Sequence, residues 1–221
     1  MNKEQRYITS DWFSDFPLGQ EAPGTRNWLD NAERKLGGKE TAVEYYFNDW
    51  RYRGTIEPGY NTNASFGCSH TLGYGVQTPY SEIIRYANIG VSGLSNDAIA
   101  RLAYAYCENF DPKCIVVMWT IPHRREYINE EGQVVKFRYD RHNENNINRE
   151  LISLQNDKWD EYNLQKNKLF LINYCISKEI RLLEYDFTGN DKQARDGMHP
   201  GPIWHANMAA QILLDIDDDS I

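Results

Sequence analysis

The chain has 221 residues, of which 41% are hydrophobic and 25% charged, so it can bury one core and does not have the composition of a disordered protein. Its net charge of −8 disfavours nonspecific binding to nucleic acid or to an anionic membrane. The N-terminal residues have no apolar stretch typical of a signal peptide, and the longest apolar run, Cys114 to Trp119, is too short to span a bilayer. We therefore expect a cytoplasmic protein. Its four cysteines form no CxxC pair and are predicted to be reduced thiols: Cys68, Cys107, Cys114 and Cys175.

Residues 1–60 are the least regular part of the sequence. They contain a Pro/Gly-rich loop, DFPLGQEAPG, and two segments that are predicted to be helices, residues 28–36 and 40–50. We expect these sixty residues to form an N-terminal extension that packs on the main body through its tryptophans and tyrosines. The main domain is predicted to cover residues 61–221.

From Asn63 onward, short apolar runs alternate with amphipathic segments. A polar insertion near residues 122–157 interrupts this order and contains a predicted hairpin around Glu131 and Gly132. Alternating strands and helices indicate an α/β fold with a parallel central sheet and right-handed crossovers. The predicted strands cover residues 64–67, 87–91, 114–119 and 180–185, and the predicted helices cover residues 80–86, 98–109, 158–177 and 203–214.

Ser69 lies in the segment FGCSHTLGYG, directly after the first predicted strand of the main domain. A serine at a strand-to-helix turn is usually the cap of the helix, because its hydroxyl accepts a hydrogen bond from a free backbone N–H. The same place also suits a nucleophile, since ligand sites of open α/β sheets lie beyond the carboxyl ends of the strands. The segment alone leaves both interpretations open.

A partner for Ser69 is present near the other end of the chain, in DGMHPG. Asp196 precedes His199 by three residues in a turn bounded by glycine and proline, so its carboxylate can reach back to the imidazole and hold one tautomer. The other ring nitrogen would then face the site. If Ser69 lies within hydrogen-bond reach, the three residues form a nucleophile, a base and an orienting acid.

Four segments, in this order, resemble the conserved blocks of the SGNH (GDSL-type) hydrolases. FGCSHTLGYG is similar to the nucleophile block, NIGVSGLSND to the second block, VVMWTIPHRRE stands where the third belongs, and DGMHPGPIWHANMAAQIL closely resembles the last. The GCSHT and WTIPHRRE variants also resemble SGNH-like proteins encoded by bacteriophages. The likeness covers residues 63–214 and leaves out the N-terminal sixty.

This resemblance implies a three-layer α/β/α, flavodoxin-like sandwich and a Ser69–His199–Asp196 triad with no metal or organic cofactor. It also implies an oxyanion hole built from the backbone N–H groups of Ser69 and Gly93. Two departures stand out. Cys68 occupies the position of the usual aspartate, and the third block lacks the usual asparagine, so Thr120, His123, Arg124 or Asn96 would have to replace that donor.

Other residues near these blocks can be interpreted as either structural or functional. We name four possible substrate contacts: His70, Trp119, His123 and Arg124. Arg124, Arg125 and Glu126 are equally compatible with a structural ion-pair cluster. His205 is expected to be a packed or capping histidine; a metal site formed by Asp196, His199 and His205 has no supporting spacing. Cys68 could be a thiol nucleophile, but it cannot share the tip of the turn with Ser69.

The sequence thus favours a serine hydrolase that cleaves carboxylic esters, with small acyl groups on a polar carrier such as an O-acetylated carbohydrate. The alternative is a weakly active or inactive protein that keeps the SGNH fold as a binding or virion-associated module. Expected partners are a small-molecule or carbohydrate ester, with a homo-oligomer or association with a virion left open. No nucleic acid or membrane partner is expected.

Overall fold

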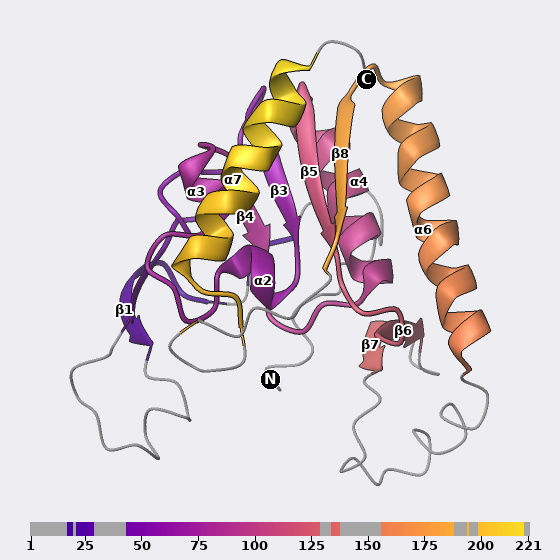
Figure 1. Cartoon of the computed structure of the whole chain (residues 1–221), viewed down its shortest axis with the longest axis horizontal. Coiled ribbons are helices and arrows are strands. Elements are labelled where there is room, and N and C mark those ends of the chain that lie inside the picture. The colour runs from indigo at the N-terminus through magenta and orange to yellow at the C-terminus, as the bar shows by residue number, and fades with distance from the viewer. Residues whose placement is uncertain are drawn as a thin grey trace, which may run out of the picture.

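The apolar run CIVVMW forms β5 (Cys114–Trp119), an inner strand of a four-stranded parallel sheet (Figure 1). The computed structural model describes residues 17–19, 21–28, 43–128, 134–137, 156–187, 194 and 199–218. The sheet order is β4 (Ala87–Gly90), β3 (Ala64–Gly67), β5 and β8 (Arg181–Asp186), and every neighbouring pair is parallel. All four strands were expected within a residue or two of these bounds, and the α/β class with a parallel sheet is confirmed.

Helices cover both faces of this sheet, so the structure has three layers. Alternate side chains of β5 separate the two cores: Ile115, Val117 and Trp119 pack with α4 (Asn96–Phe110) and α6 (Asp157–Ser177). Val116 and Met118 pack on the other face with α3 (Tyr80–Ile83) and α7 (Pro202–Asp217). In Figure 1, α7 crosses in front of the sheet and α4 lies behind it. These four helices confirm the predicted ones, each with bounds shifted by a few residues.

Chain connectivity places β3 inside the sheet, with the next strand, β4, on one side and the later strands β5 and β8 on the other. The strand order therefore reverses next to β3. In open parallel sheets, crevices that bind ligands form beyond the carboxyl ends of the strands at such a switch point. Ser69 follows β3 at this place, at the start of the short helix α2 (Ser69–Leu72).

The helix expected over residues 40–50 is wrong. Residues 43–47 form the strand β2 (Val43–Phe47), which pairs antiparallel with β1 (Gly24–Trp28). The reason is the alternation in VEYYF: Val43, Tyr45 and Phe47 are buried, and the residues between them are exposed. Period-two alternation of β-branched and aromatic side chains fits a strand better than a helix. The helix expected over 28–36 falls mostly outside the described residues, and its first residue, Trp28, ends β1.

The described part of the N-terminal extension is held on the main body by Arg53. This side chain is 2% exposed and donates hydrogen bonds of 2.5 to 2.8 Å to four backbone carbonyls, those of Leu72, Gly73, Val76 and Gln77. Its guanidinium also lies 3.9 Å from the centre of the Tyr45 ring. Burial lowers the pKa of Arg53 to about 10, so the group stays charged at neutral pH. Arg53 therefore joins the strand pair β1–β2 to the loop that follows α2.

The polar insertion contains the expected hairpin, formed by β6 (Arg125–Ile128) and β7 (Val134–Phe137) in antiparallel pairing. Its turn at Glu131 and Gly132 lies outside the described residues. All four cysteines are buried and free of disulfides, as the sequence indicated. Within the described ranges, no helix has the length and apolar character needed to cross a membrane.

Candidate active site

The turn between β3 and α2 brings the backbone of α2 directly against the end of the sheet. An ideal Cβ added to Gly90 would lie 2.2 Å from the backbone N of Leu72, and one added to Gly67 would lie 2.1 Å from Oγ1 of Thr71. Side chains at these two positions would therefore push α2 away from the strands. Gly67 and Gly90 therefore let α2 pack closely against the ends of β3 and β4, and this packing sets the position of Ser69.

Ser69 does not cap α2. The residue at the capping position is Cys68, and no side-chain hydrogen bond caps this helix. Ser69 is instead the first residue of α2, 4% exposed, and its Oγ lies 3.0 Å from Nε2 of His199. This contact joins residues 130 positions apart in the chain. The structure thus brings together two of the three residues expected from the sequence.

His199 lies just before α7, and the backbone around it is anchored. Its carbonyl accepts a hydrogen bond of 2.9 Å from the backbone N–H of Ala194, and α7 begins three residues later with Pro202 at its first position. The Tyr74 ring lies 4.9 Å from the imidazole, centre to centre, and covers one side of it. Asp196, the third expected member of the group, lies outside the described residues. Its role as the orienting acid stays a prediction.

Gly93, the expected oxyanion donor, lies in the loop that follows β4. Its φ of 73° is in the left-handed region, where glycine is favoured, and the loop is held to β3 by a bond of 3.1 Å from the backbone N–H of Val91 to Gly67 O. The loop then leads into α4, where the Ser95 hydroxyl accepts from Ala98 N at 3.1 Å. The backbone of residues 91–95 is therefore fixed next to the end of β3, where Ser69 begins α2.

Asn96 and Thr120, the proposed substitutes for the missing asparagine, bond to each other. The Asn96 amide donates to Thr120 O at 3.0 Å and accepts from Thr120 N at 2.9 Å. The Thr120 hydroxyl accepts from Nη1 of Arg124 at 3.1 Å. These bonds join the first turn of α4 to the end of β5. Asn96 therefore acts as a structural link, because its amide is used by the Thr120 backbone.

Cys68 and His70 form a second close pair beside Ser69. The Cys68 Sγ lies 3.0 Å from Nδ1 of His70 and 3.9 Å from Oγ of Ser69, and the thiol is fully buried. Burial alone would raise the pKa of the Cys68 thiol. The hydrogen bond from His70 and the charges of His70 and Arg124 outweigh that effect and lower the pKa to about 5. The pair is thus a buried cysteine whose thiol pKa is lowered by a neighbouring histidine, and the Ser69 hydroxyl donates to its sulfur.

His70 is also stacked on Phe187, with ring centres 3.4 Å apart. Its ring centre is 5.6 Å from that of His199, so it lies at the edge of the Ser69–His199 pair. Trp119 does not reach this place: it is fully buried, and its Nε1 donates to Glu184 at 2.8 Å. It is a core residue and not the substrate contact suggested by the sequence.

The charged residues of WTIPHRRE divide between the two expected roles. Arg125 forms an ion pair with Asp160 at 2.9 Å, and Glu126 forms one with Arg101 at 3.0 Å, so these two hold the insertion on α4 and α6. His123 is half-buried, and burial lowers its pKa. Arg124 has no part in those ion pairs, and its charge acts on Cys68 at the site.

His205 is a core histidine, as expected. It is 1% exposed, and its Nδ1 accepts a hydrogen bond of 3.2 Å from the backbone N–H of Tyr80. Burial lowers its pKa to about 3, which keeps the ring neutral. Among the described residues, no group of three or more histidine, cysteine or acidic side chains is placed to hold a metal ion.

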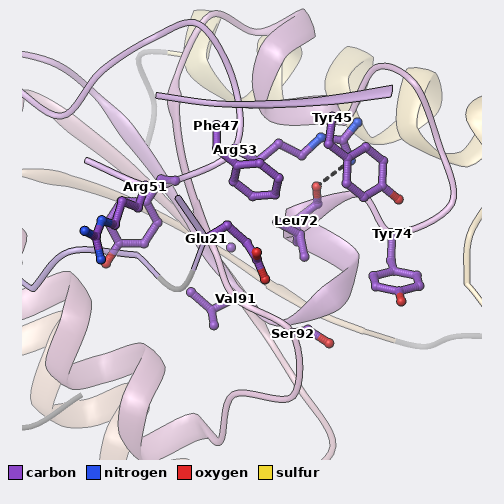
Figure 2. Close-up of a pocket in the computed structure, with 11 residues that line it drawn as sticks. Glu21, Tyr45, Phe47, Arg51, Arg53, Leu72, Tyr74, Val91 and Ser92 are labelled. Atoms are coloured by element: carbon purple, nitrogen blue, oxygen red, sulfur yellow. Dashed lines mark hydrogen bonds between the residues drawn. The ribbon is translucent and has the colours of Figure 1, made fainter. Parts of the chain in front are cut away.

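A cavity of about 120 Å³ adjoins this site, between β2 with the segment that follows it and the loops after α2 and β4. We call it the β2 cavity. Tyr45 and Phe47 line it from the N-terminal extension, and Leu72, Tyr74 and Ser92 from the main domain (Figure 2). Tyr52 lines it as well. No motif in the sequence predicts this cavity. The one local signal is the alternation in VEYYF, which predicts a strand with one apolar face but does not identify the segment that packs on that face.

Comparison with protein families, with curated proteins and with solved structures finds no match to this chain.

Proposed function

We propose that this protein is a serine hydrolase that cleaves carboxylic esters, with Ser69 as nucleophile and His199 as general base. The observation that carries the proposal is the 3.0 Å contact between Ser69 Oγ and His199 Nε2 at the switch point of a parallel sheet. A hydroxyl becomes a competent nucleophile when a base at this distance accepts its proton. The internal β3, with β4 on one side and β5 and β8 on the other, also agrees with a flavodoxin-like sandwich of the SGNH type.

The proposed reaction has two steps. In the first, Ser69 Oγ attacks the ester carbonyl carbon while its proton passes to His199 Nε2, and the carbonyl oxygen becomes an oxyanion. The backbone N–H groups of Ser69 and Gly93 would stabilise that charge. The imidazolium then gives the proton to the departing alkoxide, leaving an alcohol and an acyl-serine. In the second step, His199 deprotonates a water molecule, which releases the carboxylic acid and restores the Ser69 hydroxyl.

Asp196 would hold His199 in the required tautomer, as its place three residues earlier in the sequence suggests. No metal or organic cofactor enters these steps. Arg124 and the Thr120 hydroxyl lie on the loop after β5, where the SGNH family supplies a side-chain donor. We propose Arg124 as the third donor to the oxyanion, because the Asn96 amide is used by the Thr120 backbone.

The test is labelling with a fluorophosphonate probe, followed by mass spectrometry of the modified peptide. The adduct is expected on Ser69 in the wild type and absent from Ser69→Ala and His199→Gln. Hydrolysis of p-nitrophenyl acetate should fall by about a thousandfold or more in Ser69→Ala. Ser177→Ala, which changes an exposed serine at the end of α6, is the matched control and should label and hydrolyse as the wild type does.

The competing function is a binding or virion-associated module that keeps the fold without the chemistry. The observation that favours it is the structural use of Asn96, which leaves the site with no asparagine donor from the expected blocks. A wild-type protein that forms no adduct and hydrolyses no ester, while remaining folded, would support the binding module and rule out the hydrolase. A cytoplasmic location goes with the first function and association with a virion with the second.

A further inference from the structure

The outer face of α6 is more apolar than its place in the fold requires. α6 runs along one edge of the molecule (Figure 1) and packs on α4 and β8 with a face that includes Leu164, Leu171 and Cys175. A helix that covers a sheet in this way normally has a polar outer face. The outer face of α6 instead holds four large apolar side chains, each more than half exposed: Trp159 (53%), Tyr162 (61%), Leu169 (58%) and Ile176 (71%).

These side chains belong to a stripe of six exposed residues, which we call the α6 stripe. Its members are separated by alternating steps of three and four residues: Trp159, Tyr162, Lys166, Leu169, Asn173 and Ile176. Alternating steps of three and four place residues in one narrow line along a helix, as in the seam of a coiled coil. The line from Trp159 to Ile176 is about 26 Å long. Its width and length suit one more helix packed alongside α6.

The spacing of the α6 stripe is the same from either end, because its steps are three, four, three, four and three. A second copy of the stripe that runs in the opposite direction therefore matches it level for level. The twofold axis would lie midway between Lys166 and Leu169, and interfaces with such an axis are made by the same patch on both subunits. Three kinds of contact would then repeat on both sides of the axis: Trp159 with Ile176, Tyr162 with Asn173, and Lys166 with Leu169.

The side chains that would meet are chemically compatible. Trp159 and Ile176 bury apolar area at each end of the stripe. The Asn173 amide nitrogen donates to Leu169 O of its own helix at 2.7 Å, and its amide oxygen can accept from the Tyr162 hydroxyl of the other copy. The aliphatic part of Lys166 can pack on Leu169 while its ammonium group stays in water. No charge is buried without a partner in this arrangement.

The charges beyond the two ends of the stripe favour the antiparallel direction. Lys158 comes directly before Trp159, Glu179 comes three residues after Ile176, and both are exposed. Antiparallel pairing brings the Lys158 ammonium of one copy near the Glu179 carboxylate of the other, whereas parallel pairing brings two Lys158 side chains together. The dipoles of the two 21-residue helices also oppose each other only in the antiparallel arrangement.

We propose that the α6 stripe is the interface of a symmetric, antiparallel dimer of this chain. A stripe of this length, with two aromatic residues, buries on the order of 500–600 Å² on each copy. The total is at the low end of the range for specific interfaces, so the expected Kd is on the order of 10 µM. The proposal does not depend on the chemistry proposed for Ser69.

Dimerisation is tested by sedimentation velocity of the full-length protein from about 1 to about 300 µM. Leu169→Lys places two lysines opposite each other at the twofold axis and is expected to weaken the dimer by about tenfold or more. Leu214→Lys is the matched control, because it changes a leucine that is 66% exposed on α7, and it should dimerise as the wild type does. A wild type that stays monomeric throughout, or equal dimerisation of the two variants, would overturn the proposal.

The direction of pairing is tested by mild oxidation of Tyr162→Cys/Asn173→Cys. These positions are about 16 Å apart on one helix, too far for a disulfide within the chain, so any new disulfide joins two copies. The double variant is expected to form a covalent dimer. Tyr162→Cys alone should form none, and neither should the wild type, whose four cysteines are buried. Cross-linking by Tyr162→Cys alone, or none by the double variant, would contradict antiparallel pairing.

Discussion

Gly90→Ala tests whether the close packing of α2 on the sheet positions Ser69. The added Cβ would lie 2.2 Å from Leu72 N, 2.6 Å from Thr71 C and 2.7 Å from Leu72 Cα, and all three are backbone atoms that no rotamer change can move. Ordinary contacts begin at 3.4 Å, so α2 and β4 must separate by about 1.2 Å. Overpacking of this kind costs about 1–3 kcal/mol of unfolding free energy.

The same displacement should reach the chemistry, because Leu72 and Ser69 belong to one helical turn. A misplacement of about 1 Å in a catalytic group costs on the order of a hundredfold in rate. We expect Gly90→Ala to lower the unfolding free energy, measured by urea denaturation, by about 2 kcal/mol. We expect its fluorophosphonate labelling at Ser69 to slow by about a hundredfold.

Gly59→Ala is the matched control for this substitution. A Cβ at Gly59 would meet only Oγ1 of Thr62 at 3.4 Å and Glu57 O at 4.0 Å, and its φ is not in the left-handed region. It should change stability by less than about 0.5 kcal/mol and leave labelling unchanged. If Gly90→Ala were as stable and as reactive as Gly59→Ala, the close approach of α2 to β4 would not set the position of Ser69.

Three further predictions concern buried polar groups. Arg53→Met should lower the unfolding free energy, measured in urea, by on the order of 3 kcal/mol, because buried carbonyls lose a charged donor. Arg85→Met, which changes an exposed arginine, should cost far less. Equal losses of unfolding free energy in the two variants would refute the role of Arg53. His205 has a pKa lowered by burial to about 3, so only the unfolded state takes up its proton between pH 6.5 and 3 and stability falls as the pH falls through that range. His205→Gln should reduce this loss by up to about 1.4 kcal/mol per pH unit, and parallel pH–stability curves would contradict the burial of a neutral ring. The pKa of Cys68 is lowered to about 5, so the thiolate absorbance that the wild type has and Cys68→Ser lacks should titrate well below the pH at which an ordinary thiol ionises. A midpoint in the range of an ordinary thiol would contradict the lowered pKa of Cys68.

The elements that could be predicted from the sequence are those with a strong local pattern. CIVVMW is apolar at every position because β5 is covered on both faces, and α4 shows one apolar face because it lies on the sheet. VEYYF was misassigned because its five residues fit a strand, while the flanking residues suggested a longer helical segment. Its partner, β1, lies far enough away in the sequence that no local signal connects them.

The site was predictable where it depends on the order of motifs, and less so where it depends on side-chain direction. Ser69 and His199 meet because both follow strands or precede helices at the same edge of the sheet. Successive side chains of a strand point to opposite faces of the sheet, so Trp119 lies on the same face of β5 as Ile115 and Val117. This places Trp119 in the core with α4. The use of Asn96 by Thr120, and the cavity between the N-terminal extension and the loops after α2 and β4, depend on contacts between distant segments.

The inner position of β5 in the sheet bears on whether the protein aggregates when it unfolds. Six uncharged residues rich in β-branched side chains, with no proline, are the type of segment that pairs with identical copies to form cross-β aggregates. In the native sheet both edges of β5 are occupied, by β3 and by β8. β8, which is the last strand of this sheet among the described residues, carries charged side chains that discourage further pairing. Release of β8 alone would expose one edge of β5 to other molecules. Loss of the native state by heat is therefore expected to end in precipitation instead of reversible unfolding, and faster at higher protein concentration.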